Sequence, residues 1–366
     1  MEIKGEINKS TQKNTYFLLN LTILNHMTNQ SSIKWPSLSV IMINRNDSTK
    51  MKQSLASLSE QDYPKDLIET LVIDGGSSDN SKEVAKKYGA KFIDGGYSEN
   101  QEARRAVGTK HAKNEILLFL DTDNYLPYKT WLKDMLQPLI EDLNIFASQP
   151  SRYTHRKNDS IFNRYCSLFG VNDPVVFYLG KQDRMAHYDN GWTLKGDAED
   201  KGNYYKVKFT SSNLSTVGCN GFLIRREVLN KVVGDPENFF HIDVIFDLLE
   251  LGYTNIAFIK NDIIHDTSTT LTNLMKKRMI YLKTHSVELA KRRRYRVYDS
   301  NKFKDNLLLV KFLFFTVTLV KPLFDSLRGF VKRPDIAWFV HPVICWIFLY
   351  AYGMSVVRKI DLTSKR

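Results

Sequence analysis

Cysteine is scarce in this 366-residue chain, and the first residues contain no cleavable signal peptide that we recognise. The three cysteines, Cys166, Cys219 and Cys345, lie far apart. Their spacing excludes a disulfide framework or a cysteine zinc cluster and fits a reducing compartment. Because 43% of the residues are apolar, the chain can bury a substantial core, which excludes a disordered protein.

The excess of positive over negative charge lies entirely in the C-terminal quarter. The net charge is +12, yet residues 1–275 carry 32 basic and 34 acidic side chains, whereas residues 276–366 carry 20 and 6. The same quarter contains the two longest apolar stretches. We therefore predict anionic lipid headgroups, rather than nucleic acid, as its partner. A solvated basic face is the alternative.

The organisation along the chain predicts three parts. Residues 1–36 are rich in Asn, Lys, Ser and Thr and are predicted to be a poorly ordered leader, since the apolar patch at 16–24 is too short to span a bilayer. Residues 37–285 are predicted to form the catalytic domain. Residues 286–366 are predicted to form basic and apolar membrane-associated helices.

Strands and helices alternate in the first half of the predicted domain. Short apolar runs predict buried strands at 39–47, 67–74, 90–96 and 115–120, and helical spacing fills the intervals. This order predicts an α/β fold with a mostly parallel sheet, whose ligands bind beyond the carboxyl ends of the strands. Residues 151–217 have no clear pattern, and 196–205 are predicted to be a loop. A helix is predicted within 239–253 and a strand at 255–266.

Asp121 and Asp123 follow the most apolar of these strands. Residues two apart in a strand point to the same side, so both carboxylates are predicted to reach into one crevice. Asp-x-Asp alone is common in surface loops. Carboxylates that a buried strand carries into a cleft are costly without a cation. A divalent cation held by one or two carboxylates together with phosphates would balance them.

Five motifs together resemble the family 2 glycosyltransferases in order and spacing, over roughly residues 37–285. They are SVIMINRND, VIDGGSSDNS, EARRAVG, LLFLDTDN and GCNGFLIRRE. The resemblance implies a glycosyltransferase A fold, a nucleotide-sugar donor linked to UDP or GDP, inversion at the anomeric carbon, and Mn²⁺ or Mg²⁺ as cofactor.

The resemblance also implies roles for individual donor-site residues. It puts Asn44 and Arg45 at the base-binding strand end, Asp74 on the nucleobase and Arg104 beside the nucleotide. Asp121 would touch the ribose and share the cation, Asp123 would bind the metal, and His265 would be a third ligand or a phosphate contact. Taken singly, Asp74 could instead cap the next helix, Arg104 could be a solvated charge and His265 could be structural. Arg45 replaces an aromatic residue common in the family, although a guanidinium plane can also stack on a base.

The region expected to supply the general base departs from the family pattern. An inverting transfer needs a base to take the proton of the acceptor hydroxyl. The family usually has a Glu-Asp pair ahead of a helix that ends in Gly-Tyr, and FFHIDVIFDLLELGY has the helix without the pair. Asp243, near the predicted helix start, is the first choice. His241, which aligns better, is the second, and Asp247 is expected to be a surface charge on the helix.

The C-terminal quarter indicates a membrane-associated, non-processive enzyme. The segment KKRMIYLK lacks the tryptophan of the Gln/Arg-x-x-Arg-Trp motif that processive members of the family carry. The apolar stretches 307–324 and 336–357 are predicted to lie in or re-enter the cytoplasmic leaflet, together with the basic segment KRRRYRV. Two buried helices of a soluble domain are the alternative. A membrane location would suggest a lipid-linked acceptor.

Two other functions compete with this interpretation. A nucleotidyltransferase uses a similar sheet and metal, but INRNDSTK has none of the glycines of the phosphate loop that normally follows its first strand. A catalytically inactive membrane scaffold of the same fold would explain the missing Glu-Asp pair. Sugar transfer to a soluble glycan or protein is the alternative to a lipid-linked acceptor.

Overall fold

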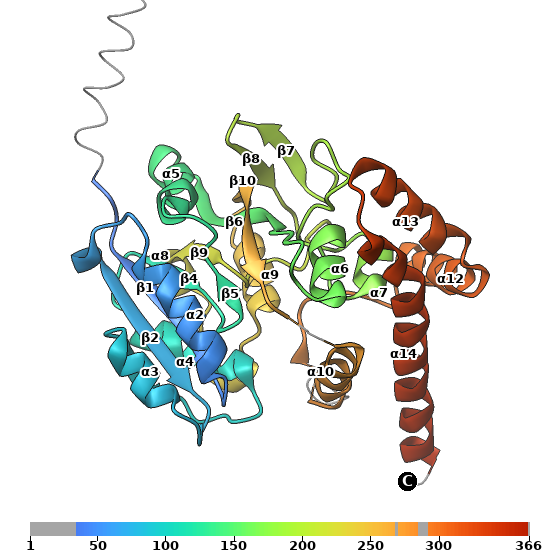
Figure 1. The fold of residues 1–366 in the computed structure, drawn as a ribbon, viewed down its shortest axis with the longest axis horizontal. Coiled ribbons are helices and arrows are strands. Elements are labelled where there is room, and N and C mark those ends of the chain that lie inside the picture. The colour runs from blue at the N-terminus through green and yellow to red at the C-terminus, as the bar shows by residue number, and fades with distance from the viewer. Residues whose placement is uncertain (1–33, 268–269, 285–291, 365–366) are drawn as a thin grey trace, which may run out of the picture. The chain divides into compact units, whose positions relative to one another are not determined.

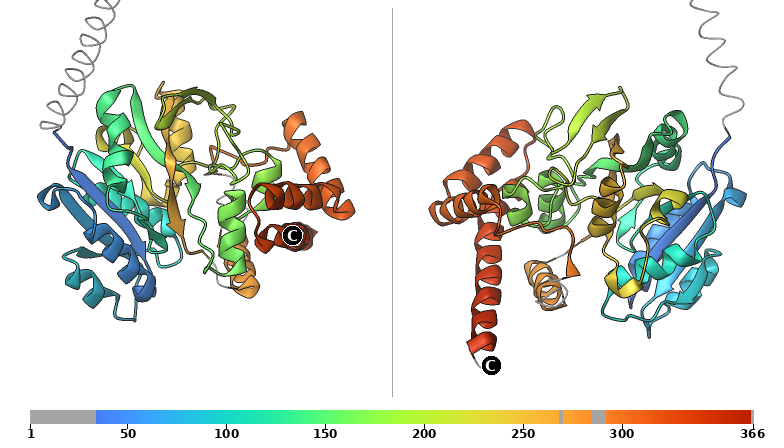
Figure 2. Two further views of the ribbon diagram at one scale, coloured as in Figure 1. Left: turned by 45° about the horizontal axis from the view of Figure 1, so that its top comes forward. Right: turned by 180° about the vertical axis from the view of Figure 1, so that it is seen from behind.

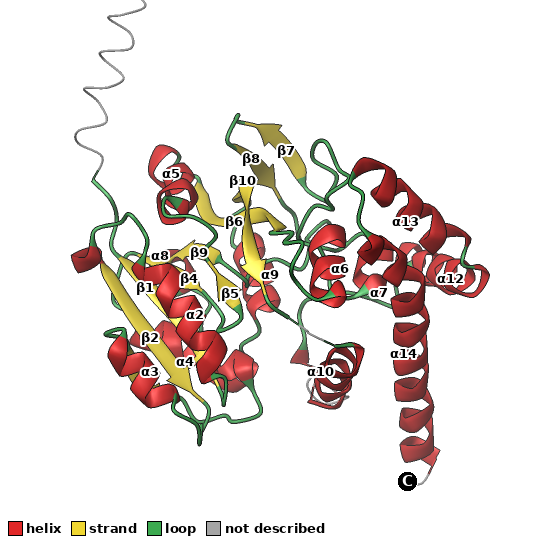
Figure 3. Cartoon of the chain, viewed as in Figure 1, coloured by secondary structure: helices red, strands yellow, loops and turns green. Residues whose placement is uncertain are grey.

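A mixed sheet runs through the molecule, with strand order β3-β2-β1-β4-β9-β6-β10-β8-β7 (Figures 1 and 3). The computed structural model describes residues 34–267, 270–284 and 292–364, so the predicted leader 1–36 lies almost wholly outside the described residues. The predicted α/β fold is confirmed.

The first half of the sheet is parallel and is built as the sequence predicts. Its strands are β1 (Leu38–Asn44), β2 (Ile68–Asp74), β3 (Lys91–Asp94) and β4 (Ile116–Phe119). Between them run α2 (Ser48–Ser59), η2 (Lys65–Leu67), α3 (Ser81–Lys87) and α4 (Gln101–His111). The register sets Asn44 opposite Asp74 and Asp74 opposite Asp94. The polar ends of three neighbouring strands therefore meet at one edge.

The second half of the sheet is mixed. It contains β5 (Asn124–Tyr125), α5 (Trp131–Glu141), β6 (Ile145–Tyr153), α6 (Ile161–Phe169), α7 (Pro174–Tyr178), β7 (Asp197–Asp200), β8 (Tyr204–Lys208), β9 (Phe222–Arg225), α8 (Arg226–Leu229), η3 (Pro236–Asn238), α9 (His241–Glu250) and β10 (Asn255–His265). Strand β9 is antiparallel to both β4 and β6, whereas β6 and β10 are parallel.

The predicted loop at 196–205 is wrong, because these residues form most of the β7–β8 hairpin. All four residues of β7 are exposed. An edge strand with solvent on both faces lacks the apolar alternation by which a strand is recognised.

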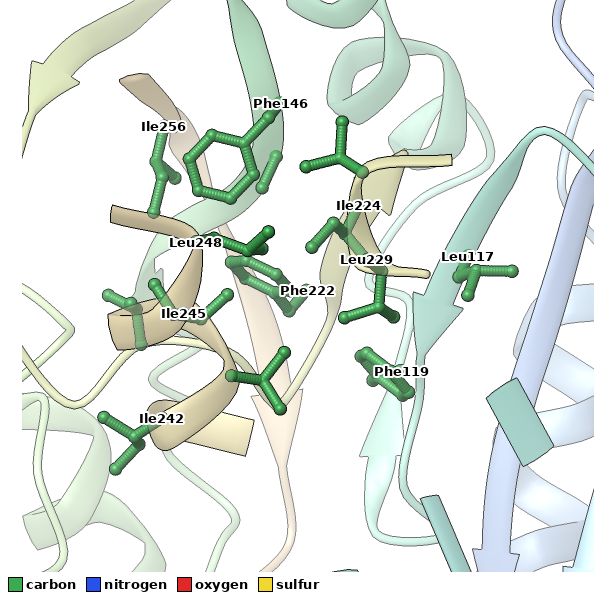
Figure 4. Packing of buried hydrophobic residues seen from close by; sticks show 14 of the residues in the cluster. Leu117, Phe119, Phe146, Phe222, Ile224, Leu229, Ile242, Ile245, Leu248 and Ile256 are labelled. Carbon is green, nitrogen blue, oxygen red and sulfur yellow. The ribbon is translucent and has the colours of Figure 1, made fainter. Parts of the chain in front are cut away.

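The core between the sheet and α9 fixes the position of that helix. Ile245 and Leu248 of α9 are buried against Phe146 of β6, Ile224 of β9 and Ile256 of β10 (Figure 4). Side chains at i and i+3 lie on one helix face, so the apolar spacing of α9 presses this face onto the sheet. The N-terminal turn of α9 is thereby held at the carboxyl edge of the strands.

The C-terminal helices pack on the catalytic part of the chain. They are α10 (Leu271–Thr284), α12 (Phe303–Thr318), α13 (Val320–Lys332), η4 (Ile336–Val340) and α14 (His341–Ser364), seen from two sides in Figure 2. Trp338 is fully buried, 4.8 Å from the ring of Phe169 in α6. A Cβ at Gly329 would lie 2.4 Å from Trp338, so glycine lets α13 approach this ring. Residues Leu38–Arg366 accordingly form one compact unit across the predicted boundary at 285.

Candidate active site

Asp121 and Asp123 lie in a tight turn between β4 and β5. Strand β4 ends at Phe119, the Asn124 amide donates to the Asp121 carbonyl over 3.0 Å, and the Asn124 side chain accepts from the Asp121 amide over 3.2 Å. The two carboxylates are predicted to share one face of a strand. This is wrong, because both residues lie in the turn that follows the end of β4. The turn directs them to different partners, Asp121 to Arg105 and Asp123 to His265.

Asp121 is held by a guanidinium from α4. Its Oδ2 accepts from Arg105 Nη2 over 2.6 Å. Burial raises the pKa of Asp121 above its usual value, although Arg105 acts in the opposite direction. Arg105 is itself 3% exposed and also pairs with Glu102, one helical turn before it. Burial disfavours its charge, but Asp121 and Glu102 together raise the pKa of Arg105.

Glu102 extends this contact to the start of α9. Its carboxylate accepts from the His241 amide over 3.0 Å and lies 3.1 Å from the ring Nδ1 of His241. Although burial alone would lower it, the neighbouring Glu102 raises the pKa of His241 to about 10. His241 is therefore an imidazolium at neutral pH, which is the wrong protonation state for a general base. Four side chains of alternating charge, the partly exposed Asp121 and His241 and the buried Arg105 and Glu102 between them, thus connect the turn after β4 with α9.

Sequence reasoning missed Glu102 and Arg105 as functional residues. Their signal was their i, i+3 spacing on a helix that otherwise presents Ala103, Ala106 and Gly108 to the core. Charged residues on the buried face of a short helix, which here include Arg104 as well, require partners, and the neighbouring strand end supplies one to Arg105.

Asp123 and His265 are brought together by the pairing of β5 with β10. Asn124 is opposite His265 in this ladder, and the Asp266 amide donates to the Asp123 carbonyl over 2.8 Å. The Asp123 Oδ2 and His265 Nε2 atoms are 3.7 Å apart. Two ligands of one divalent ion lie about 3 Å apart when their bonds of about 2.1 Å are at right angles, so a small movement lets both bind it.

These residues fit a cation that shares its coordination with phosphate. Among the described residues, no group of three or more His, Cys, Asp or Glu side chains is disposed to hold a metal alone. Mg²⁺ and its relatives are usually bound by one or two carboxylates plus substrate phosphates. Asp123, with one fifth of its side chain exposed, and His265 would hold such an ion at this edge.

The residues predicted for the nucleotide surround the ends of β1 and β2. Asn44 donates to Asp74 over 2.8 Å, and Asp74 also accepts from the amides of Gly76 and Ser77 over 2.9 and 2.7 Å. Burial opposes its charge, but these hydrogen bonds hold the pKa of Asp74 below its usual value. Asp74 thus shapes its own glycine turn and does not cap α3, whose N-cap is Asn80.

The two predicted arginines border the same edge. Arg104 is buried against Gly75 and donates to the carbonyls of Tyr97 and Ser98 over 2.8 and 2.9 Å. Arg45 is more exposed, pairs with Glu99 and also donates to Ser98. Both guanidinium groups therefore lie around the loop that follows β3.

Asp243 is occupied by the basic segment after α10. Its carboxylate accepts from Arg293 Nε over 2.9 and 3.0 Å and from the amides of Arg294 and Tyr295 over 3.3 and 3.0 Å. It is 1% exposed. Both carboxylate oxygens of Asp243 are thus engaged by residues 293–295, and its predicted role as base stays a prediction. Asp247 lies on α9 as predicted and pairs with Arg294 over 2.7 Å.

Part of the segment KRRRYRV, which is predicted to lie on lipid, packs on protein. The Arg293 guanidinium lies 3.5 Å from the centre of the Phe240 ring, and the buried Tyr295 donates to the carbonyl of Leu214 over 2.8 Å. Arg293 and Arg294 thus pair with the carboxylates of α9, and Tyr295 is buried, whereas Arg292 and Arg296 are exposed. Lys291 lies outside the described residues.

Comparison with known proteins gives a family match. A profile described as "Glycosyl transferase family 2" matches residues 39–233, more than half of the chain. The glycosyltransferase AglE of Haloferax volcanii is 31% identical over 103 residues, which are 27% of this chain and 34% of AglE. The 4,4'-diaponeurosporenoate glycosyltransferase of Staphylococcus haemolyticus is 30% identical over 161 residues, 41% of this chain and 42% of the relative. Each match spans less than half of the relative's own length.

A solved structure was also compared. The mannosyltransferase PcManGT from Pyrobaculum calidifontis, in complex with GDP-Man and Mn²⁺, has a TM-score of 0.49 at 13% identity, over 94% of this chain and 96% of that one.

Proposed function

Because the chain belongs to glycosyl transferase family 2, we propose that it transfers a sugar, with inversion, from a nucleotide-sugar to a membrane-associated, lipid-linked acceptor. One observation carries the donor half of this proposal. The turn after β4 presents Asp123 beside His265, and Asp121 beside a buried guanidinium, at the edge where three strands end in polar residues.

The donor-site roles follow the position of each residue along this edge. Asn44, Arg45, Asp74 and Arg104 surround the ends of β1 and β2 and would receive the nucleoside of a UDP- or GDP-linked sugar. Asp121 would reach the ribose. Asp123 and His265 would hold Mn²⁺ or Mg²⁺, which when bound neutralises the charge that develops on the departing diphosphate.

Positively charged side chains of the protein would also stabilise the departing diphosphate. His241 keeps its proton up to high pH because of Glu102, and Arg105 lies two contacts away from it. Positive groups fixed in place near developing negative charge lower the barrier without reorganisation at the moment of reaction. We assign His241 this electrostatic role, and the proton acceptor is considered separately below.

Exposed apolar side chains on the C-terminal helices support a membrane location. In the described part of the chain, one helix, Ile336–Val356, is long and apolar enough to cross a bilayer, and 44% of its apolar window is buried in protein. Helices α12 and α13 are bent by 80° at Leu319. Exposed apolar residues on these helices are Leu307, Val310, Phe314, Val317, Val320, Phe324, Leu327, Val331, Ile336, Val343, Trp346 and Tyr350. Apolar side chains exposed in such number along neighbouring helices indicate a site of interaction.

The charge on these helices favours the cytoplasmic leaflet as the partner. Lys304, Lys311, Arg328, Lys332 and Arg333 accompany the exposed apolar residues. Basic side chains beside an apolar helix face bind anionic headgroups, at about 1 kcal/mol for each charge near the surface. We therefore propose that α12 and α13 rest on the leaflet.

The test measures nucleoside diphosphate release by the full-length protein from a panel of UDP- and GDP-sugars, with Mn²⁺, Mg²⁺ or chelator. Vesicles that contain a polyprenyl phosphate and vesicles without it are compared. We expect metal-dependent release from one donor, accelerated by the polyprenyl phosphate. Release that only a soluble glycan accelerates would replace the lipid acceptor. No release from any donor, with or without acceptor, would favour an inactive scaffold.

A further inference from the structure

Asp183 is a buried carboxylate in the segment between α7 and β7, where the sequence showed no clear pattern. The residue is 7% exposed. Its carbonyl accepts from Gln149 Nε2 of β6 over 2.9 Å, and the next-but-one amide, of Met185, donates to the Ser151 carbonyl over 2.8 Å. The backbone of Asp183 is thus fixed to β6, which pairs with β10, the strand that ends at His265.

One series of contacts leads from Asp183 to His265. Asp183 Oδ2 accepts from Arg184 Nη1 over 2.5 Å, and the Arg184 guanidinium lies 5.2 Å from the centre of the Tyr153 ring. The Tyr153 ring centre lies 5.0 Å from that of His265. Two side chains, Arg184 and Tyr153, therefore connect Asp183 with His265.

A second series leads from Asp183 to His241. Arg184 Nη2 donates to the carbonyl of Asn220 over 2.9 Å. Asn220 belongs to the turn 218–221, in which Gly218 has φ of +119°, and a Cβ at Gly218 would lie 3.3 Å from the His241 ring. The turn brings the backbone close to the imidazolium. Asp183 is thus connected through Arg184 both to His265 and to the turn beside His241.

The other carboxylates at this edge already have defined partners. Asp121 and Glu102 pair with Arg105, and Glu102 also pairs with His241. Asp243 binds three consecutive residues of the 293–295 segment. Asp123 faces His265 in the position of a metal ligand. Asp183 differs from them in having a single guanidinium partner on its own segment.

We propose that Asp183 is the general base that takes the proton of the acceptor hydroxyl. That proton moves to an Asp183 carboxylate oxygen while the acceptor oxygen forms a bond to the anomeric carbon. The bond from this carbon to the diphosphate oxygen breaks, and its electron pair stays on the diphosphate. The inference rests on the proposed function, because it requires a nucleotide-sugar donor.

The electrostatic environment of Asp183 suits this role. Burial raises its pKa above the usual value, while Arg184, His241 and His265 lower it. A carboxylate of raised pKa is a stronger base than an exposed one, yet the surrounding cations favour its ionised form. A positioned general base typically contributes about 10²- to 10⁴-fold to the rate.

The experiment compares Asp183→Asn with Asp189→Asn in the full-length protein. Asp189 is a matched control, because it is a buried carboxylate six residues further along that accepts from Thr193 and from the amide of Ala186. Release is measured with the donor that the wild type uses fastest and with water as the acceptor probe. We expect Asp183→Asn to lower kcat by about 10²- to 10⁴-fold with the donor KM within about threefold. Asp189→Asn should change kcat by less than about threefold.

Rescue by azide provides a second measurement, which remains informative even if a variant folds less well than the wild type. A small anion can enter the space left in Asp183→Ala and attack the anomeric carbon without giving up a proton. We expect azide to restore nucleoside diphosphate release in Asp183→Ala, with formation of the inverted glycosyl azide, and not in Asp189→Ala. Wild-type-like kcat in Asp183→Asn, or no azide product from Asp183→Ala that still binds the nucleoside diphosphate, overturns the base assignment alone. No release by the wild type overturns the proposed function as well.

Discussion

The two halves of the sheet hold their charged side chains in different ways. In the parallel half, part of the contacts are local, since Asp74 accepts from Gly76 and Ser77, although Asn44, 30 residues away, also donates to it. In the mixed half they are distant, since 139 residues separate His241 from Glu102 and 50 separate Asp243 from Arg293. The residues around the carboxyl ends of β1 and β2 thus belong to short sequence motifs, whereas the charged contacts around α9 form only in the complete fold. The predictions below test this contrast.

The largest expected effect is on the donor edge. Asp123→Ala should abolish metal-dependent turnover, because it removes the carboxylate that lies beside His265. Membrane binding should be unchanged. Asp66→Asn, an exposed carboxylate in the turn before β2, is the matched control and should keep full activity. Nucleoside diphosphate release is the measurement, and retained activity in Asp123→Ala would refute the assigned role.

The next effect is on the free energy of unfolding, through the paired charges of Asp121, Arg105, Glu102 and His241. Glu102→Gln should cost about 3–5 kcal/mol in free energy of unfolding, because it leaves the buried Arg105 and His241 without their shared carboxylate. Urea unfolding measures this cost. Glu83→Gln on the exposed face of α3 should cost less than about 1 kcal/mol. Equal losses of unfolding free energy in Glu102→Gln and Glu83→Gln would show that Glu102 stabilises the fold no more than an exposed carboxylate does.

The same variant has a pH signature. Glu102 raises the pKa of His241 to about 10 from an ordinary value of 6.5. A raised pKa in the folded state gives stability that is complete below pH 6.5 and is lost as the pH rises through about 10. The difference in unfolding free energy between wild type and Glu102→Gln should therefore shrink from pH 6.5 to 10. NMR titration of the imidazole should show a lower pKa in the variant.

A smaller effect separates anchoring from catalysis at Asp243. Asp243→Asn should cost about 1.5–3 kcal/mol in unfolding free energy, because it weakens hydrogen bonds to a charged group. Turnover per folded molecule should stay within about threefold. Asp247→Asn, whose partner Arg294 is more exposed, should cost less than about 1 kcal/mol. A loss of kcat of about 100-fold at unchanged stability would restore Asp243 as the base and displace Asp183.

The smallest effect concerns the membrane. Phe324→Glu should weaken binding to anionic vesicles by about tenfold, because a fully buried phenylalanine contributes about 1.5–3 kcal/mol and part of this ring already contacts protein. Phe324 is 59% exposed, and Leu143, 81% exposed in the loop after α5, provides the control Leu143→Glu. Vesicle co-sedimentation measures both. Equal binding by the two variants would remove α13 from the membrane surface.

The sequence predicted most of the parallel half, because short apolar runs and glycine turns are local signals. Asp121 and Asp123 could be singled out for this reason, and their roles stay predictions. The β7–β8 hairpin was missed because an exposed edge strand has no apolar alternation. Glu102, Arg105 and Asp183 were missed because their importance depends on burial and on partners that only the folded chain brings close.

Leu319 determines how far the C-terminal helices could reach through a bilayer. It has φ of +59°, a conformation that costs a leucine about 1–2 kcal/mol. At 1.5 Å per residue, α12 and α13 are about 24 and 20 Å long, each shorter than a hydrocarbon core of about 30 Å. Straightened into one helix they would measure about 45 Å and cross it. The backbone torsion of a single residue thus decides whether this segment adds a crossing to the topology of the chain.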